Sequence, residues 1–265
     1  MTEPLVISAT DANGIVRLTM NRPDVRNAFN PDLVHELAAA LDRAAELPGT
    51  RAVVLAGAGK VFSAGADLEN MRRAGTLSED ANTADAMNVS RLLDRLDSMP
   101  VPAIALVQGA AIAGGLGLVA ACDVVIAAAD AVFAISEVRL GLIPAMISPY
   151  VIGAIGARQA RRYMLTGERF DAARAMRMGL VHQVAASADD LDATLRPLID
   201  AILLAAPGAV ADTKSLLRES GRTSPGPEGQ ARLARVLAQR RASPEAREGV
   251  DAFLEKRPPD WQKPS

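Results

Sequence analysis

The chain has 265 residues, of which 49% are hydrophobic, so it is long enough to bury a large core. Its 29 basic and 31 acidic side chains nearly cancel, and the net charge of -2 excludes the basic surplus that marks a nucleic-acid-binding protein. Its one cysteine, Cys122, excludes an internal disulfide framework and a cysteine-cluster metal site.

The N-terminal part predicts a β-hairpin, a helix and a further strand. Leu5–Thr10 and Gly14–Met20 are mostly apolar runs on either side of an Asn-Gly turn, which is a strong hairpin signal. Asn30 followed by Pro31 is typical of a helix start. Arg51–Ala56 then predicts a short strand, so strands and helices alternate as in an α/β protein. The apolar stripe of the helix comprises Leu33, Leu37, Leu41 and Ala44.

The middle of the chain continues this alternation. Residues 70–99 are polar and helix-prone, and the expected inner face of this stretch consists of Met87, Leu92, Leu93 and Leu96. Short strands are predicted near Val124–Ala127, Ala131–Ile135 and Val181–Val184. Helical patterns cover residues 148–166 and 171–178, and Gly179 is a stop signal.

Beyond residue 187 the whole pattern is helical. A loop rich in Gly, Ser and Pro, Ser220–Glu228, separates a helical stretch over 188–219 from another over 229–256. We therefore divide the chain into a β/α core, residues 1–187, and a helical C-terminal region, residues 188–265.

The stretch Val101–Cys122 carries no charge over 22 residues, so it could just span a bilayer. The alternative is a buried strand, a glycine turn and a buried helix. We favour the second interpretation and expect no membrane segment, because residues 109–117 contain four glycines and the first residues favour a strand. A glycine-rich turn that leads into a helix exposes backbone N–H groups, which can hold a negative charge.

Common ligand-binding motifs are absent from the sequence. Gly57–Lys60 resembles part of a phosphate-binding P-loop, but Val54 and Val61 stand where that motif needs Gly and Ser or Thr. Residues 115–120 lack the third glycine of a dinucleotide-binding fingerprint, and no G-x-S-x-G element is present.

The histidines limit the kinds of catalytic and metal site that the chain can form. The two histidines, His35 and His182, lie in no motif for zinc or for a serine–histidine triad. We therefore expect no bound metal and a chemistry based on carboxylates, hydroxyls and backbone groups.

Met1–Pro4 has neither the basic nor the apolar region of a secretion signal, so we expect a cytoplasmic protein.

Two loops remain as candidate ligand sites, and each follows a predicted strand. Phe62–Leu68 follows the strand at 53–56, and Gly109–Gly117 follows the strand at 101–107. If these strands are neighbours, both loops lie at the carboxyl edge of the sheet, where α/β folds bind ligands. Small residues would let backbone N–H groups approach one ligand oxygen and stabilise charge on a polarised carbonyl. The alternative is two tight glycine turns that serve only packing.

Several motifs together carry a resemblance to a known family. They are Asn21–Phe29, Phe62–Leu68, Gly109–Asp123, Ser136–Pro144 and Ser243–Phe253, and they occur in the order and spacing of the crotonase (enoyl-CoA hydratase/isomerase) superfamily. The resemblance covers nearly the whole chain. It implies an α/β fold: a ββα spiral core with two roughly perpendicular sheets, which binds acyl-CoA and is catalytic. The helical C-terminal region would then build a homotrimer, commonly paired into a homohexamer.

The resemblance also implies the site residues. The amides of Ala66 and Gly114 would bind the thioester oxygen of an acyl-CoA substrate, and Glu137 would transfer the proton. Arg26 would contact a phosphate of coenzyme A, which is part of the substrate, so no separate cofactor is expected. The alternative for Glu137 is a surface salt bridge with Arg139. The residues implied to contact the substrate are Arg26, Ala28, Ala64, Gly65, Ala66, Asp67, Leu68, Gly114, Gly117 and Pro144.

The sequence departs from the family pattern in two places. A second glutamate of the family's hydratases falls at Gly117, and Ala113 replaces a usual glycine; Asp67 or Glu69 could take over the task of the missing carboxylate. One glutamate suffices for hydration of a 2-enoyl-CoA and for isomerisation of a 3-enoyl-CoA to a 2-enoyl-CoA. We expect a hydratase; the alternatives are the isomerase and a non-catalytic acyl-CoA-binding protein.

The acyl pocket resembles one branch of the superfamily more than others. Leu142–Val151, Arg158–Tyr163 and Gly115–Leu118 are similar to the branch that hydrates methylglutaconyl-CoA and isohexenylglutaconyl-CoA. Substrates of that branch carry a second carboxylate, so the resemblance implies an arginine or a hydroxyl such as Ser148 as its partner. A branched or carboxylated acyl group is the resulting expectation.

Overall fold

The computed structural model describes residues 3–219 and 226–262, and its strands form two sheets. The main sheet has the order β1-β2-β3-β4-β6-β9; β1 and β2 pair antiparallel and the other neighbours pair parallel. Its strands are β1 (Val6–Thr10), β2 (Ile15–Met20), β3 (Ala52–Gly57), β4 (Ala103–Val107), β6 (Val124–Ala128) and β9 (Gln183–Ala185). In the second sheet β7 pairs parallel with β5 and antiparallel with β8. Its strands are β5 (Ala110–Ile112), β7 (Val132–Ala134) and β8 (Arg169–Asp171).

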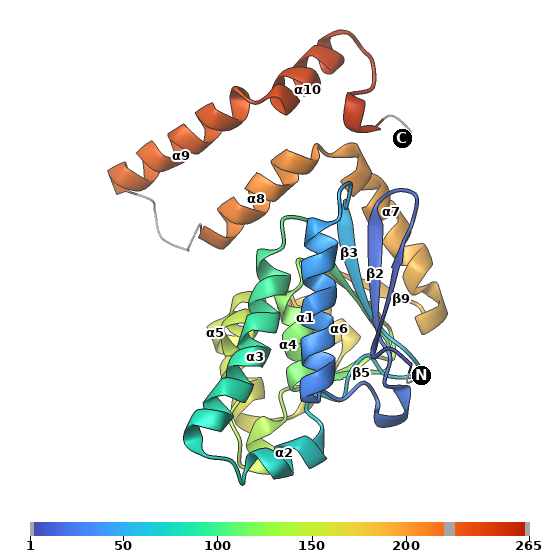
Figure 1. The fold of residues 1–265 in the computed structure, drawn as a ribbon, viewed down its shortest axis with the longest axis vertical. Coiled ribbons are helices and arrows are strands. Elements are labelled where there is room, and N and C mark those ends of the chain that lie inside the picture. Colours follow the sequence, from blue (N-terminus) through green and yellow to red (C-terminus); the bar gives the residue numbers. More distant parts are fainter. Residues whose placement is uncertain (1–2, 220–225, 263–265) are drawn as a thin grey trace.

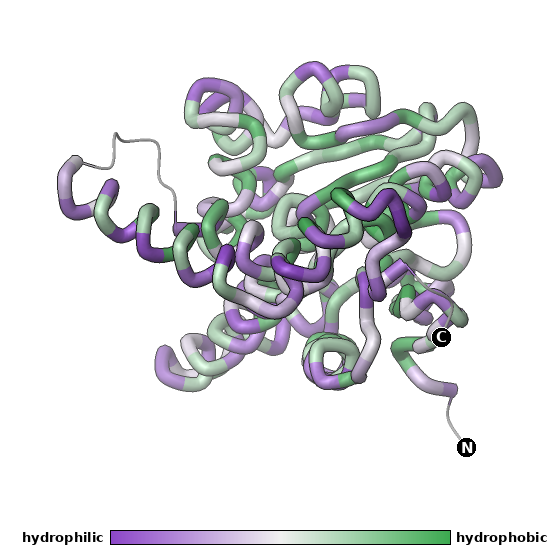
Figure 2. Tube along the Cα trace, turned by 90° about the horizontal axis from the view of Figure 1, so that it is seen from above, coloured by the Kyte–Doolittle hydropathy of each residue, from purple (hydrophilic) through white to green (hydrophobic). Residues whose placement is uncertain are grey.

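Helices cover both faces of the main sheet, and the C-terminal helices extend beyond it (Figure 1). The helices are α1 (Pro31–Glu46), α2 (Leu68–Ala74), α3 (Glu79–Ser98), α4 (Gly114–Ala121), α5 (Ser148–Thr166), α6 (Ala172–Met178), α7 (Leu191–Leu204), α8 (Pro207–Glu219), α9 (Gly226–Arg241) and α10 (Pro244–Leu254). Short 3-10 turns are η1 (Pro23–Val25), η2 (Glu137–Leu140), η3 (Ala188–Asp190) and η4 (Asp260–Gln262). Hydrophobic residues concentrate along the central strands and the helices that adjoin them (Figure 2).

Each face of the main sheet packs against a different set of helices. Val53 and Leu55 of β3 belong to a large core shared with α1, α3 and α4, whereas Val54 belongs to a smaller core with Leu191 and Leu195 of α7. Both faces of β3 and β4 are therefore buried. This explains why these strands are apolar at every position instead of at alternate ones.

The sequence predictions for the first half of the fold are largely confirmed. The hairpin forms as β1 and β2, and the Oδ1 atom of Asn30 accepts a hydrogen bond from the Leu33 amide at the start of α1. The neutral stretch Val101–Cys122 contains β4, β5 and α4, so it is a strand, a turn and a buried helix. No single helix of the described residues is long and apolar enough to cross a membrane; α7 with η3 and α8 pass that test together only as a pair bent by 106°.

Other predictions need correction. The helical stretch over 70–99 is two helices, because Gly75 ends α2 and Ser78 caps α3. Met87 is 42% exposed and is not part of the inner face, which contains Leu92, Leu93 and Leu96. The stretch 188–219 bends before Pro207, whose ring disfavours a helical conformation of the preceding residue. In the predicted loop Ser220–Glu228, α9 already begins at Gly226, and residues 220–225 lie outside the described residues.

Candidate active site

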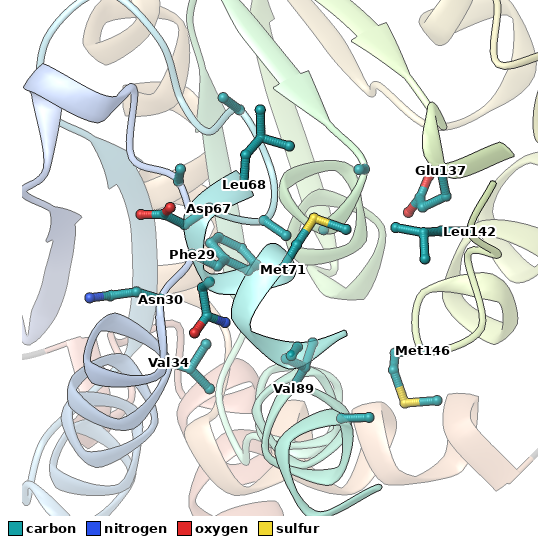
Figure 3. Close-up of a pocket in the computed structure, with 18 of the residues that line it drawn as sticks. Phe29, Asn30, Val34, Asp67, Leu68, Met71, Val89, Glu137, Leu142 and Met146 are labelled. Carbon is teal, nitrogen blue, oxygen red and sulfur yellow. The ribbon is translucent and has the colours of Figure 1, made fainter. Parts of the chain in front are cut away.

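A cavity of about 860 Å³ opens beside the loops that follow β3 and β4. Side chains from several elements point into it: Met71 from α2, Val89 from α3, and Glu137 and Leu142 from the segment around η2 (Figure 3). The loops meet here because β3 and β4 are parallel neighbours, as the sequence predicted, and their carboxyl ends lie at one edge of the sheet.

The backbone amide of Ala66 is a free donor at this cavity. Phe29 pairs with the loop through a parallel bridge: its amide donates to the Gly65 carbonyl (2.7 Å), and its carbonyl accepts from the Asp67 amide (2.8 Å). In such a pairing the residue between the two contacts directs its own N–H away from the partner strand. No acceptor is recorded for the Ala66 amide among the described residues, and Ala66 lines the cavity.

Buried polar groups fix this loop. Asn27 is fully buried, and its Nδ2 atom donates to the carbonyls of Ala58 (2.9 Å) and Val61 (2.8 Å). The Ser63 hydroxyl donates to the Asn27 carbonyl (2.9 Å). Gly65 has a φ of 88°, and a Cβ there would lie 2.7 Å from the carbonyl oxygen of Ile112, so a larger residue would push the two loops apart.

The amide of Gly114 is the second free donor. It belongs to the first residue of α4, where a helix leaves its N–H groups without intrahelical partners. The preceding Ala113 has φ 48° and ψ -117°, a conformation that favours glycine, while its own amide donates to the Ala134 carbonyl (2.8 Å). The Gly114 amide has no acceptor in the described part of the chain, and Gly114 lines the cavity at the positive end of the helix dipole.

Glu137 is the carboxylate of this cavity. Its Oε2 atom is buried and has no hydrogen-bond partner among the residues that the structure describes. Burial raises the pKa of Glu137 above its ordinary value, because desolvation disfavours the charged form. The alternative of a salt bridge with Arg139 is not seen: the Nε atom of Arg139 donates to the Thr166 carbonyl (3.3 Å) instead. The unpartnered Oε2 atom is available to exchange a proton with a ligand.

An apolar side chain occupies the space beside Gly117. A Cβ atom built on Gly117 would lie 2.2 Å from the Cγ2 atom of Ile147, which is 3% exposed and lines the cavity. Gly117 itself lies behind this wall. Glu69 does not line the cavity either, whereas Asp67 does, with its carboxylate paired to Arg22 at 3.2 Å.

Most of the sequence-predicted residues come together here. The cavity is lined by Arg26, Ala28, Ala64, Ala66, Asp67, Leu68, Gly114, Glu137 and Pro144, but not by Gly65 or Gly117. The sequence placed Leu142–Ile147 in the acyl pocket and Phe29 in a family motif, but it did not single out Val34, Met71 and Val89, which complete the apolar wall. No motif marks these three residues, because apolar side chains on α1, α2 and α3 have the same pattern whether they face the cavity or the core.

The charges of the wall are unevenly placed. Arg26 is the one cation among the described residues that line the cavity, and it is exposed beside η1. The Ser148 hydroxyl donates to the Ala145 carbonyl (2.9 Å), and Ser148 does not line the cavity. The wall beyond Glu137, formed by side chains such as Leu142 and Met146, is therefore apolar.

Comparison with known proteins gives a consistent result. The model of the "Enoyl-CoA hydratase/isomerase" family matches residues 10–264. A crystal structure of an enoyl-CoA hydratase from Shewanella pealeana superposes with a TM-score of 0.92 at 41% identity, covering 97% of this chain and 96% of the other. An enoyl-CoA hydratase structure from Mycobacterium smegmatis gives a TM-score of 0.91 at 34% identity, covering 98% and 100%. The 2,3-dehydroadipyl-CoA hydratase of Escherichia coli is 34% identical over 253 residues, which are 94% of this chain and 95% of the relative.

Proposed function

The chain belongs to the enoyl-CoA hydratase/isomerase family, and from this we propose that it hydrates a 2-enoyl-CoA with Glu137 as its single proton-transfer residue. Its fold is the α/β crotonase fold with C-terminal helices, and it is an enzyme of this lyase family. The observation that carries the proposal is the meeting of two free backbone donors, at Ala66 and Gly114, with a half-buried carboxylate whose Oε2 atom has no partner among the described residues, in one cavity.

The arrangement supports a stepwise or concerted addition of water. The amides of Ala66 and Gly114 would hold the thioester oxygen and polarise the conjugated double bond. The carboxylate of Glu137 takes a proton from water as the water oxygen bonds to C3, and the negative charge moves onto the thioester oxygen as an enolate. Glu137 then returns the proton to C2, which restores the thioester and the ionised carboxylate. A carboxyl group whose pKa is raised is suited to both transfers.

The acyl group that fits best is an apolar one. Met71, Val89, Leu142 and Met146 surround the space next to Glu137 (Figure 3), and the cation among the described lining residues, Arg26, belongs to the exposed N-terminal segment. A second carboxylate on the substrate would be buried there without a partner, which is unfavourable. We therefore propose a linear or branched hydrocarbon acyl group.

One feature favours a second candidate function. Ile147 occupies the space beside Gly117, so a second proton-transfer group has no room there. Isomerisation needs a single base, which removes a proton from C2 of a 3-enoyl-CoA and returns it at C4 while the enolate oxygen stays bound by the same amides. An isomerase would thus use the same amides and the same carboxylate as a hydratase. It would differ in keeping water away from C3 of the bound acyl group.

The deciding experiment offers crotonyl-CoA, 3-methylcrotonyl-CoA, 3-methylglutaconyl-CoA and a 3-enoyl-CoA to the purified protein. Loss of the enoyl-thioester absorbance with a mass gain of one water identifies a hydratase, whereas conversion of the 3-enoyl-CoA without that gain identifies an isomerase. The Glu137→Gln variant should lose about 100- to 10,000-fold in kcat, as expected for a general acid–base residue. Glu69→Gln, on the neighbouring α2 but outside the cavity wall, is the matched control. If the wild type binds acyl-CoA but converts none of these substrates, both enzymatic functions are contradicted and the protein is a non-catalytic acyl-CoA-binding protein.

We also propose that the C-terminal region joins copies of this chain into a trimer or hexamer. Support comes from large apolar side chains that the described structure leaves exposed on α8 and α10: Leu217, Val250, Phe253 and Leu254. Size-exclusion chromatography with light scattering measures the state directly. A monomer at micromolar concentration would contradict the proposal.

A further inference from the structure

We propose that Arg22 is a positioning residue that holds the Ala66 amide in the orientation needed to bind the thioester oxygen. The inference rests on the proposed role of that amide. Arg22 itself does not line the cavity, so it would act through the residues that it contacts.

The Arg22 guanidinium joins the two segments whose pairing orients Ala66. Its Nη1 atom donates to the Ala28 carbonyl, and its Nη1 and Nη2 atoms lie 3.3 and 3.2 Å from the Oδ2 atom of Asp67. Ala28 directly precedes Phe29, and Asp67 directly follows Ala66. One side chain therefore ties together both partners of the Phe29–Ala66 bridge, which is the contact that turns the Ala66 N–H toward the cavity.

The backbone of Arg22 is itself firmly held. Its amide donates to the Oδ1 atom of Asn27 (2.9 Å), and its carbonyl accepts from the Asn27 amide (2.8 Å). Asn27 is fully buried and is hydrogen-bonded to the loop after β3, so the backbone that carries the Arg22 guanidinium is held in place. The side chains of Arg22 and Asp67 are only 17% and 21% exposed, so water screens their ion pair weakly.

Charge gives the contact a second effect. Asp67 lines the cavity next to Ala66, and its Oδ1 atom accepts from the Glu69 amide at the start of α2. An uncompensated carboxylate here would repel the enolate oxygen that Ala66 is proposed to stabilise. The guanidinium neutralises it. Arginine suits this place because its planar fork reaches a carbonyl and a carboxylate at once, which the single nitrogen of lysine does not do in the same geometry.

The test compares Arg22→Gln and Arg22→Lys with the control Arg95→Gln. Arg95 forms a more exposed ion pair, 2.8 Å from Asp42, between α3 and α1 and outside the cavity wall. For each protein, kcat and KM are measured with the best enoyl-CoA substrate, and Tm by calorimetry. Binding is measured for acetoacetyl-CoA, which can bind as an enolate, and for butyryl-CoA, which keeps a neutral thioester oxygen. The ratio of the two affinities reports the donor geometry without turnover.

Both Arg22 variants should lose about 10- to 100-fold in kcat, with a smaller change in KM, as misplaced catalytic geometry predicts. Their preference for the enolate ligand should fall, while Arg95→Gln keeps the wild-type ratio. An unchanged kcat and an unchanged affinity ratio in folded Arg22 variants overturn the inference, even if Tm falls. Arg22→Lys decides the matter if Arg22→Gln does not fold. If the wild type hydrates no enoyl-CoA, the affinity ratio still decides the role of Arg22, whereas the proposed function alone fails.

Discussion

Ile147 stands where a side chain at position 117 would begin: a Cβ atom on Gly117 would lie 2.2 Å from the Cγ2 atom of Ile147. The two residues are 30 positions apart in the sequence and come from α4 and the start of α5. Their contact makes glycine necessary at 117 for as long as isoleucine stays at 147. It also keeps this part of the cavity wall apolar.

The coupling of these two positions is directly testable. Gly117→Ala should lower the free energy of unfolding by about 1–3 kcal/mol, because the new methyl group overpacks the core. Ile147→Ala alone should also destabilise the protein, by leaving a cavity. The double variant should be more stable than the sum of the two changes predicts, since each relieves the other. Urea denaturation of the four proteins gives the interaction free energy, and additivity would contradict the contact.

The raised pKa of Glu137 predicts the pH dependence of turnover. The mechanism needs an ionised carboxylate to accept the first proton, so kcat/KM should fall as the pH drops through the pKa of Glu137. Because burial raises that pKa, the fall should begin at a higher pH than for an ordinary glutamate. A rate profile against pH with crotonyl-CoA or the preferred substrate measures it. A fall in kcat/KM at the pH expected for an exposed glutamate would contradict the argument that burial raises the pKa.

The raised pKa of Glu137 also predicts how the free energy of unfolding changes with pH. Between the ordinary pKa of glutamate and the raised value, the folded state binds more protons than the unfolded state. The free energy of unfolding contributed by Glu137 should therefore decrease as the pH rises through this window. Glu137→Gln removes the contribution, so the variant should gain stability relative to the wild type toward neutral pH. Equal pH slopes of wild type and variant, measured by denaturation, would show that burial has no such effect.

Ala113 carries backbone strain that glycine would relieve. Its φ of 48° and ψ of -117° suit glycine, and this strain is of the order of 1–3 kcal/mol for other residues. Against this stands a loss of about 0.4–1 kcal/mol from the greater freedom of glycine in the unfolded chain. Ala113→Gly should thus raise the free energy of unfolding by about 1 kcal/mol, which thermal denaturation can measure. Ala113→Val, with a branched side chain at positive φ, should do the opposite and reduce kcat by displacing the Gly114 amide.

The proposed apolar acyl group predicts how specificity can be changed. Met146 lies in the wall on the far side of the cavity from Phe29 (Figure 3). Met146→Arg would place a cation in the apolar part of the wall next to Glu137, so kcat/KM should shift toward 3-methylglutaconyl-CoA and away from 3-methylcrotonyl-CoA. Met146→Leu is the control and should keep the original preference. A wild type that already prefers the carboxylated substrate would refute the apolar assignment.

The sequence predicted those parts of the site that depend on backbone shape. Gly65 and the glycines around Gly114 mark positive φ values or close approaches, and these requirements are local. The part of the apolar wall on α1, α2 and α3 escaped prediction because a methionine at the cavity, such as Met71, has the same pattern as one in the core. Met87 shows the converse: α3 borders the cavity near Val89 before its buried leucines begin, so a single inner face does not describe the whole helix.

Main-chain donors give this site an unusual tolerance to genetic change. The N–H groups of Ala66 and Gly114 remain whatever side chain a mutation introduces, and only proline, which has no amide hydrogen, deletes one outright. The wall formed by Met71, Leu142 and Met146 has no such protection, because each amino-acid substitution there alters its shape. Descendants of this sequence can therefore acquire new acyl preferences by substitution at the wall while the two proposed thioester-binding amides are retained.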